Sequence, residues 1–259
     1  MVRKELKIKY KNSVLGFAWS LLNPLLYLVV FYIAFEKILG SSIPSFPIYL
    51  LSGLLVWNLF STGLGAATGS VVANAGLVKK VSFPREILPL ASVGSMLVHF
   101  FLQSGVLFAV LAIARWHVAW EYLPLVPVAL VALLLVTGSL GILLSAVNVY
   151  LRDTQHFLEL ALLAWFWVTP IVYPFQLVGA RGGWFTKVWM ANPVTPIVLI
   201  FQRALYAKLD NGPDHPLLPH WSYGVYVGYL GMSFAFGLIV LALAVYVFGR
   251  AETNFAEEL

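Results

Sequence analysis

The sequence NAGLVKKVSFPREILP, at residues 74–89, carries the charges that separate two long uncharged runs. These charges are Lys79, Lys80, Arg85 and Glu86. Charged side chains lie in hydrocarbon only at a large free-energy cost, so the stretch predicts a water-facing turn between two membrane spans. Pro84 interrupts any continuous helix and favours an extended backbone at Phe83, and a helix can restart after Arg85. We therefore expect a kinked, basic turn, named the first elbow (residues 74–89).

The composition indicates an integral membrane protein. Of the 259 residues, 61% are hydrophobic and only 10% are charged, whereas about 25% are charged in soluble domains. The net charge of +5 is small and locally concentrated, which favours contact with anionic lipid headgroups. It does not provide the large basic face that binding of nucleic acid requires. The absence of cysteine excludes disulfides and thiolate chemistry. The first dozen residues are unlike a signal peptide, so we expect the N-terminus to stay attached.

Six uncharged runs predict an all-α integral membrane fold with six transmembrane helices. About 20 apolar residues are enough to cross a bilayer as a helix. Small residues recur at four-residue intervals in the second run, at Ser61, Gly65 and Gly69, and favour close helix packing. The fifth run is rich in aromatic residues and is broken by Pro170 and Pro174, so we expect it to end early. The expected spans cover residues 15–36, 47–72, 90–114, 122–148, 157–174 and 222–249.

Three further segments complete the expected organisation. Residues 1–14 place apolar and basic side chains on different sides of one helix, which is typical of an amphipathic interface helix, although a soluble helical tail fits the same pattern. Residues 181–205 are apolar but too short and too broken by prolines to span, which favours a re-entrant or interfacial pair of helices. Residues 251–259 form an acidic tail that we expect to lie in water.

A second polar turn, NVYLRDTQHF at residues 148–157, follows the fourth run and is named the second elbow. Two expected spans separate it from the first elbow, so both elbows are expected on the same side of the membrane. Placing the N-terminus inside puts most of the 16 Lys and Arg residues in cytoplasmic segments, as the positive-inside rule favours. We therefore expect both termini and both elbows in the cytoplasm.

The sequence lacks the motifs of a catalytic or self-powered protein. It has no phosphate-binding GxxxxGK[ST] loop, no HExxH and no cysteine-based metal pattern. The expected spans hold no carboxylate pair and almost no ionisable group, which disfavours intramembrane catalysis and ion-driven transport. We therefore predict a transport permease with no cofactor of its own. In this interpretation ATP and Mg²⁺ bind a separate ATPase subunit that pushes on the two elbows.

Several stretches together resemble one known family, the permeases of type-2 ABC exporters for polysaccharides and polyol phosphates. Its members include O-antigen, capsular, galactan and teichoic acid exporters. The resemblance covers nearly the whole chain in order and assigns residues 15–250 to its transmembrane domain. The first of these stretches begins earlier than in other members, which indicates an abbreviated surface helix or a misassigned start. The stretches are YKNSVLGFAWSLLNPLL (10–26), SGLLVWNLF (52–60), the two elbows, WVTPIVYP (167–174) and NPVTPIV (192–198).

The resemblance implies a homodimeric permease in the bacterial cytoplasmic membrane, bound to two copies of an ATPase subunit. The implied cargo is an undecaprenyl-diphosphate-linked polysaccharide such as an O-antigen, with teichoic acid, a drug or a small lipid as alternatives. Residues 77–88 of the first elbow resemble the coupling helix that the ATPase grips, and residues 181–205 resemble paired gate helices. A plain positive-inside loop is the alternative interpretation of the first elbow. The implied coupling residues are Leu77, Lys79, Lys80, Phe83, Pro84, Arg85, Glu86, Arg152 and Asp153.

Aromatic and basic side chains also gain roles from the resemblance. Flat aromatic rings suit the apolar faces of sugars, although an interfacial aromatic belt explains the same residues. The candidates for lining a substrate path between protomers are Trp57, Phe60, Trp165, Phe166, Trp167 and Tyr173. The lysines that could attract the diphosphate at the cytoplasmic entrance, or lipid headgroups instead, are Lys4, Lys7, Lys11, Lys79 and Lys80. A non-transporting scaffold or intramembrane enzyme is the remaining class, which purification without any ATPase partner would support.

Overall fold

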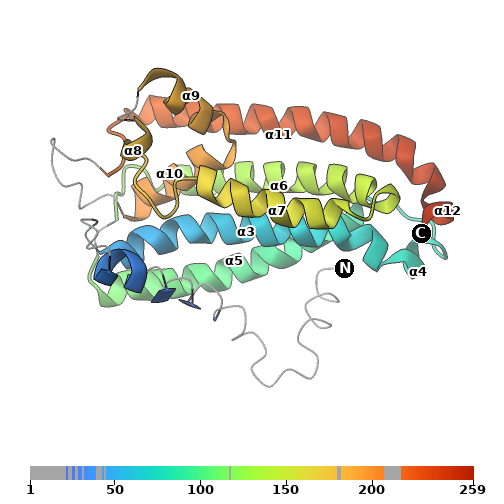
Figure 1. Cartoon of the computed structure of the whole chain (residues 1–259), viewed down its shortest axis with the longest axis horizontal. Helices are drawn as coiled ribbons and strands as arrows, with labels where there is room; N and C mark the ends of the chain where they lie inside the picture. Colours follow the sequence, from blue (N-terminus) through green and yellow to red (C-terminus); the bar gives the residue numbers. More distant parts are fainter. Residues whose placement is uncertain are drawn as a thin grey trace.

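The computed structural model is all-helical over the part of the chain that it describes, which confirms the all-α part of the predicted fold class (Figure 1). The described residues are 22, 25–26, 29–30, 32–38, 43, 45–116, 118–179, 182–206 and 217–259. The predicted interface helix at residues 1–14 and most of the predicted first span lie outside these residues, as do Lys4, Lys7 and Lys11. The first element with described bounds is the π-helix η1 (Tyr32–Ile38).

Four long apolar helices form the bundle, and they overlap the second, third, fourth and sixth expected spans. They are α3 (Phe46–Ala73), α5 (Ile87–Ile113), α6 (Leu125–Tyr150) and α11 (Tyr223–Ala251). Among the described residues, these four are long and apolar enough to cross a membrane. The shortest, α6, has 26 residues and is about 39 Å long, which exceeds the ~30 Å hydrocarbon core. The total of six spans stays a prediction.

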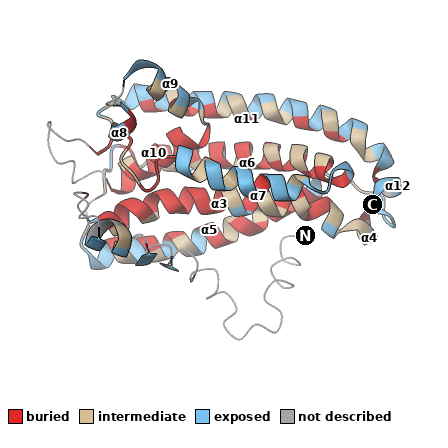
Figure 2. Cartoon of the chain, viewed as in Figure 1, coloured by how far each residue is buried: buried red, intermediate tan, exposed pale blue. Residues whose placement is uncertain are grey.

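Helix α3 lies at the centre of the bundle and is buried along most of its length (Figure 2). It packs against both α5 and α6. The approach to α6 is closest where a Cβ atom added to Gly141 would lie 2.6 Å from the Cβ of Ala67. The repeat of Ser61, Gly65 and Gly69 does not make this contact, because a Cβ added to Gly65 would meet nothing within 4 Å. Within the repeat, Gly69 approaches α7 instead, since a Cβ added to it would lie 3.3 Å from the side-chain oxygen of Gln155.

The fifth expected span differs from the helix found there. Helix α7 (Thr154–Val168) begins before residue 157 and ends at Thr169, where the backbone becomes extended just ahead of Pro170. Its 15 residues give a length of about 22 Å, which is less than the ~30 Å hydrocarbon core. The early end that the prolines predicted is confirmed, whereas the expected extent of 157–174 is not observed as one helix.

Residues 183–205 form the predicted pair of helices, α9 (Gly183–Ala191) and α10 (Val194–Leu205), after the single turn of α8 (Gln176–Gly179). The chain turns between the two helices at Asn192 and Pro193. Proline suits the start of α10, because the backbone N–H that it lacks would have no partner within the helix there. Helix α10 is buried on nearly every side among α3, α6 and α11 (Figure 2). We call the end of the bundle that holds α8, α9 and α10 the far end.

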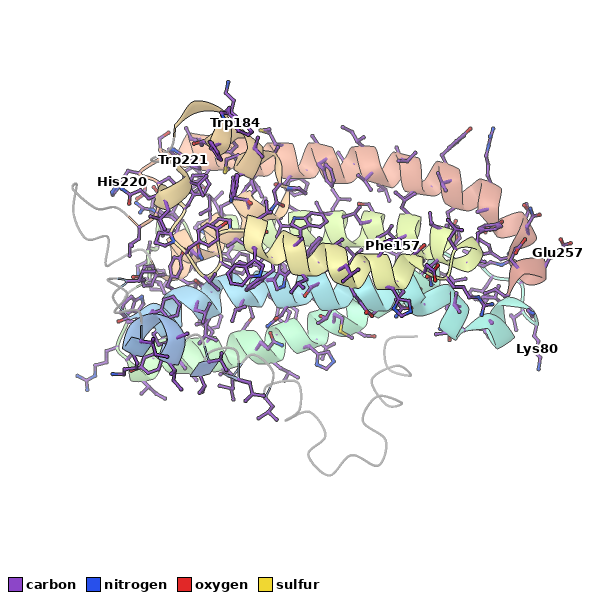
Figure 3. The ribbon with its side chains drawn as sticks, in the orientation of Figure 1. Lys80, Phe157, Trp184, His220, Trp221 and Glu257 are labelled. Carbon is purple, nitrogen blue, oxygen red and sulfur yellow. The ribbon has the colours of Figure 1, made fainter. Side chains whose placement is uncertain are left out.

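The opposite end of the bundle brings together segments that are distant in sequence (Figure 1). It holds the short helix α4 (Ala75–Val78) of the first elbow, the α6–α7 turn of the second elbow, and two short helices after α11, η3 (Glu252–Asn254) and α12 (Phe255–Glu258). Figure 3 shows Lys80 and Glu257 at this end, and Trp184, His220 and Trp221 at the other. We call it the elbow end.

Candidate functional site

The first elbow is a broken helix, as Pro84 predicted. Helix α3 ends at Asn74, whose side-chain amide donates to the carbonyl of Ser70 at 2.9 Å. One helical turn, α4, follows, and the chain then leaves helical geometry until α5 begins at Ile87. The elbow is therefore a short, broken turn that connects the ends of two long helices, α3 and α5.

The inner side of the first elbow rests on an apolar cluster, named the elbow-end cluster. Val78 and Leu88 belong to it and are only 3% and 1% exposed. Leu77 and Phe83, two of the predicted coupling residues, pack against it and are partly buried. Sequence reasoning missed Val78, although it is an apolar residue directly before two lysines. The cluster consists of Val71, Val78, Leu88, Ile142, Ala146, Val149, Ala244, Phe248 and Phe255.

The outer side of the first elbow presents cations to solvent. Lys79, Lys80 and Pro84 are exposed, while Arg85 and Glu86 are partly buried. In the second elbow, Arg152 and Asp153 are exposed at the turn from α6 into α7. The structure therefore places the predicted coupling residues at one end of the bundle, but it separates them into an exposed set and a set held against the protein.

The segment after α11 folds back onto the first elbow, whereas a tail in water was expected for residues 251–259. Phe255 is completely buried in the elbow-end cluster, where its ring lies edge-on to Phe248 with centroids 5.2 Å apart. The guanidinium of Arg85 lies 5.9 Å from the centroid of the Phe255 ring and donates a hydrogen bond to the backbone carbonyl of Glu252. In the sequence, the signal for this contact is Phe255, a single aromatic residue in a segment that contains three glutamates.

An open hollow lies between the first elbow and this segment. Its volume is about 440 Å³, and both the elbow and the residues after α11 contribute to its wall. Its polar wall includes Lys79, Lys80, Ser82, Arg85, Glu252 and Thr253. A hollow lined by cations and hydroxyl groups suits an acidic or polar side chain of a protein partner.

A second candidate site is a groove of about 400 Å³ between α3 and α7, named the aromatic groove. Trp57, Phe166 and Trp167 line it, and the rings of Trp57 and Phe166 lie edge to face with centroids 5.5 Å apart. Polar groups lie beside these rings, namely Asn58, Ser61, Thr62 and Glu159. The combination of flat apolar rings and hydrogen-bonding groups matches the chemistry of a sugar, which has apolar C–H faces and polar hydroxyl edges.

Three predicted path residues do not line the aromatic groove. Phe60 is fully buried and packs its ring against Trp165 at a centroid distance of 5.0 Å, so it supports the groove from behind. The indole N–H of Trp165 donates to the side-chain oxygen of Asn192 at 2.9 Å, which fixes the ring toward the far end. The Tyr173 hydroxyl donates to the carbonyl of Trp167 at 2.8 Å and accepts from Trp189 at 3.0 Å.

Glu159 was overlooked in the sequence, where the expected spans were taken to hold almost no ionisable group. It lies within residues 157–174, on α7, and its carboxylate is 3.9 Å from Nδ1 of His156. The side chain of Glu159 is 67% exposed. A single charged residue one turn into an apolar run is easily assigned to the preceding loop, yet it places a carboxylate in the groove wall. Among the described residues, no group of three or more potential metal ligands comes together.

Comparison with known proteins identifies the class to which these features belong. Residues 1–206 match the ABC-2 type transporter family. An O-antigen export system permease protein RfbA of Klebsiella pneumoniae is 26% identical over 259 residues, which is 100% of this chain and 93% of the relative. Another RfbA, of Myxococcus xanthus, is 34% identical over 207 residues, 80% of this chain and 78% of the relative. The polysialic acid transport protein KpsM of Escherichia coli is 23% identical over 254 residues, 94% of this chain and 89% of the relative. A multi-pass helical bundle with two polar elbows at one end, matched over most of its length, places this chain in the ABC-2 type transporter family.

Proposed function

We propose that this chain is the permease subunit of an ATP-driven exporter that moves an O-antigen-type polysaccharide, carried on undecaprenyl diphosphate, across the bacterial cytoplasmic membrane. The observation that carries the proposal is the full-length similarity to O-antigen export permeases. The elbow-end geometry supports it, because exposed cations at the turns between long helices suit a docking partner.

The power source in this proposal is a separate ATPase, of which two copies bind a homodimer of this chain. Lys79 and Lys80 lie on the exposed side of the first elbow, and Arg152 and Asp153 are exposed on the second. The first elbow joins α3 to α5 and the second joins α6 to α7, so the two contacts reach four helices. Movement of the ATPase would be transmitted to the walls of the path through these turns.

The path in this proposal includes the aromatic groove. Trp57, Phe166 and Trp167 offer flat faces on which successive sugar rings can stack and slide, and aromatic rings lose little conformational entropy in doing so. Glu159 and Asn58 can accept and donate hydrogen bonds to sugar hydroxyls. Lys79 and Lys80 are close to the place where a diphosphate would enter from the cytoplasm.

The proposal is tested with the permease and its ATPase reconstituted in vesicles that contain lipid-linked polysaccharide. Replacing Lys79 and Lys80 with alanine should weaken ATPase binding and reduce export, while Lys187→Ala, an exposed lysine at the far end, should leave both unchanged. Because lysines also influence insertion, the orientation of each variant is checked with a membrane-impermeant thiol reagent on a single introduced cysteine. Wild-type vesicles that hydrolyse ATP but export no polysaccharide would contradict the proposal, as would a double variant that exports normally.

A further inference from the structure

We propose that residues 252–259, named the tail clamp, hold the two elbows together so that they move as one unit. Phe255, Tyr150 and Arg85 are the positioning residues of this clamp. Its consequence for transport rests on the proposed function, whereas its existence as a mechanical link does not. Phe255 lies beyond residues 1–206, which are the residues matched by the family.

The first observation is the burial of Phe255 in a segment whose composition favours water. Three glutamates, Glu252, Glu257 and Glu258, surround it in sequence, yet Phe255 is completely buried. Full burial of a phenylalanine side chain removes a large apolar surface from water and therefore stabilises the docked state. Its ring contacts groups from three places, namely Phe248 on α11, Tyr150 at the end of α6 with centroids 6.2 Å apart, and Arg85 of the first elbow.

The second observation is that each elbow donates a hydrogen bond to the end of α11. Carbonyl groups at a helix C-terminus have no partner within the helix, and they carry partial negative charge. The Tyr150 hydroxyl, from the second elbow, donates to the carbonyl of Ala251 at 2.8 Å. The Arg85 guanidinium, from the first elbow, donates to the next carbonyl, that of Glu252. Two elbows distant in sequence therefore meet on consecutive peptide groups.

This geometry divides the predicted coupling residues into two functions. Arg85 is partly buried and engaged by Glu252 and Phe255, so its cation is directed inward, whereas Lys79 and Lys80 remain exposed. The lysines are then the docking contacts, and Arg85 fixes the elbow to the rest of the permease. A displacement of the first elbow is passed through Arg85 and Phe255 to Tyr150, at the start of the turn into α7. Loss of the clamp should therefore leave docking intact and reduce transmission.

The test compares variants of the full permease in complex with its ATPase, using polysaccharide exported per ATP hydrolysed as the readout. Phe255→Ala should leave co-purification of the ATPase unchanged and lower this ratio by roughly tenfold, since it removes aromatic contacts and a cation–π contact together. Phe255→Leu, which keeps most of the buried apolar surface, should recover part of the ratio. Tyr150→Phe, which removes a single hydrogen bond, should lower the ratio about twofold.

The control for simple destabilisation is Leu111→Ala, a buried residue on α5 toward the far end. It should reduce the amount of folded permease and leave the export ratio of the remaining protein unchanged. A normal ratio in Phe255→Ala would overturn the clamp, and so would loss of ATPase binding in that variant, because the tail would then form part of the docking surface.

A second measurement depends on the clamp alone. The chain has no native cysteine, so Ser82→Cys and Glu257→Cys allow two spin labels to be placed at exposed positions, one on the first elbow and one on the tail clamp. The distance distribution should be narrow in this background and should broaden when Phe255→Ala is added. An unchanged distribution would overturn the clamp. A broadened distribution in a complex that never exports polysaccharide would instead retain the clamp and reject the proposed function.

Discussion

Different interactions hold the backbone in place at the two ends of the bundle. At the far end, buried hydrogen bonds hold the irregular backbone around Pro170 and Pro193 inside the protein. At the elbow end, an apolar cluster and two hydrogen bonds to the end of α11 hold the turns, and cations face outward. Buried backbone polar groups need hydrogen-bond partners, so the irregular backbone of the far end is accompanied by dense pairing. The elbow end instead presents Lys79 and Lys80 to solvent.

Asn192 shows how the far end is tied. Its side-chain oxygen accepts from the indole N–H of Trp165 at 2.9 Å and from the backbone N–H of Val194 at 3.0 Å. Its amide donates to the Thr169 hydroxyl at 3.0 Å. One side chain thus connects α7, the extended residue after it, and the first turn of α10. Gln202 adds a bond to the carbonyl of Pro170 at 3.3 Å.

The largest loss of stability is expected from removing the side chain of Asn192. Asn192→Ala leaves the N–H groups of Trp165 and Val194 without their acceptor, and each such group costs about 1–3 kcal/mol when it is buried. Asn74→Ala, at the elbow end, removes one bond to a helix carbonyl and should cost about 1 kcal/mol or less. Thermal unfolding of both variants in detergent measures the difference. Equal losses of stability would contradict the contrast between the ends.

A smaller loss of stability is expected when α3 and α6, the helices that connect the two ends, are forced apart. Gly141→Ala places a methyl group 2.6 Å from the Cβ of Ala67 and should destabilise the permease by about 1–3 kcal/mol, because α3 and α6 must move apart. Gly105→Ala is the matched control, since nothing lies within 4 Å of the added group. Comparing the melting temperatures, and the export ratio per ATP, tests whether close α3–α6 packing relays movement between the ends. Similar behaviour of the two variants would show that it does not.

The aromatic groove should give a transport effect without a stability effect. Trp167→Ala removes an exposed ring from its wall, and Glu159→Gln removes a charge while keeping the shape. We expect export to fall roughly threefold to tenfold for Trp167→Ala, the range that one aromatic contact supplies. ATP hydrolysis and ATPase binding should stay at the wild-type level, and Trp184→Ala, an exposed ring on α9, serves as the control. Loss of ATPase binding in Trp167→Ala would contradict the separate roles of groove and elbow.

The sequence predicted the long helices and the break points well, since both depend on local chemistry. Uncharged runs identified α3, α5, α6 and α11, and prolines predicted the break at Pro84 and the early end of α7. The faces of the helices were harder to predict. A helix in lipid is apolar on every side, so no periodic pattern distinguishes the buried Phe60 from the groove-lining Trp57 or selects Gly141 as the contact with α3.

The sequence identified the two elbows as polar turns, but it did not distinguish the surroundings of their individual residues. The charges of the two elbows are visible in the sequence because charged residues must leave the hydrocarbon. The contact of Arg85 with Glu252 and Phe255 joins segments 167 residues apart in the sequence, and no local pattern reports such a pair. The exposed lysines and the inward-directed Arg85 therefore appeared equivalent in sequence, although the fold gives them different surroundings.

Cross-linking from residue 79 in oriented vesicles tests most directly the central claim, that an ATPase drives this permease through the first elbow. A photoactivatable group on Lys79→Cys should link to the ATPase at the cytoplasmic face, and the same group on Lys187→Cys should not. A membrane-impermeant thiol reagent added outside should label only the cysteine at position 187. Labelling of position 79 from outside, or a complex that exports polysaccharide with no cross-link from position 79, would contradict the account.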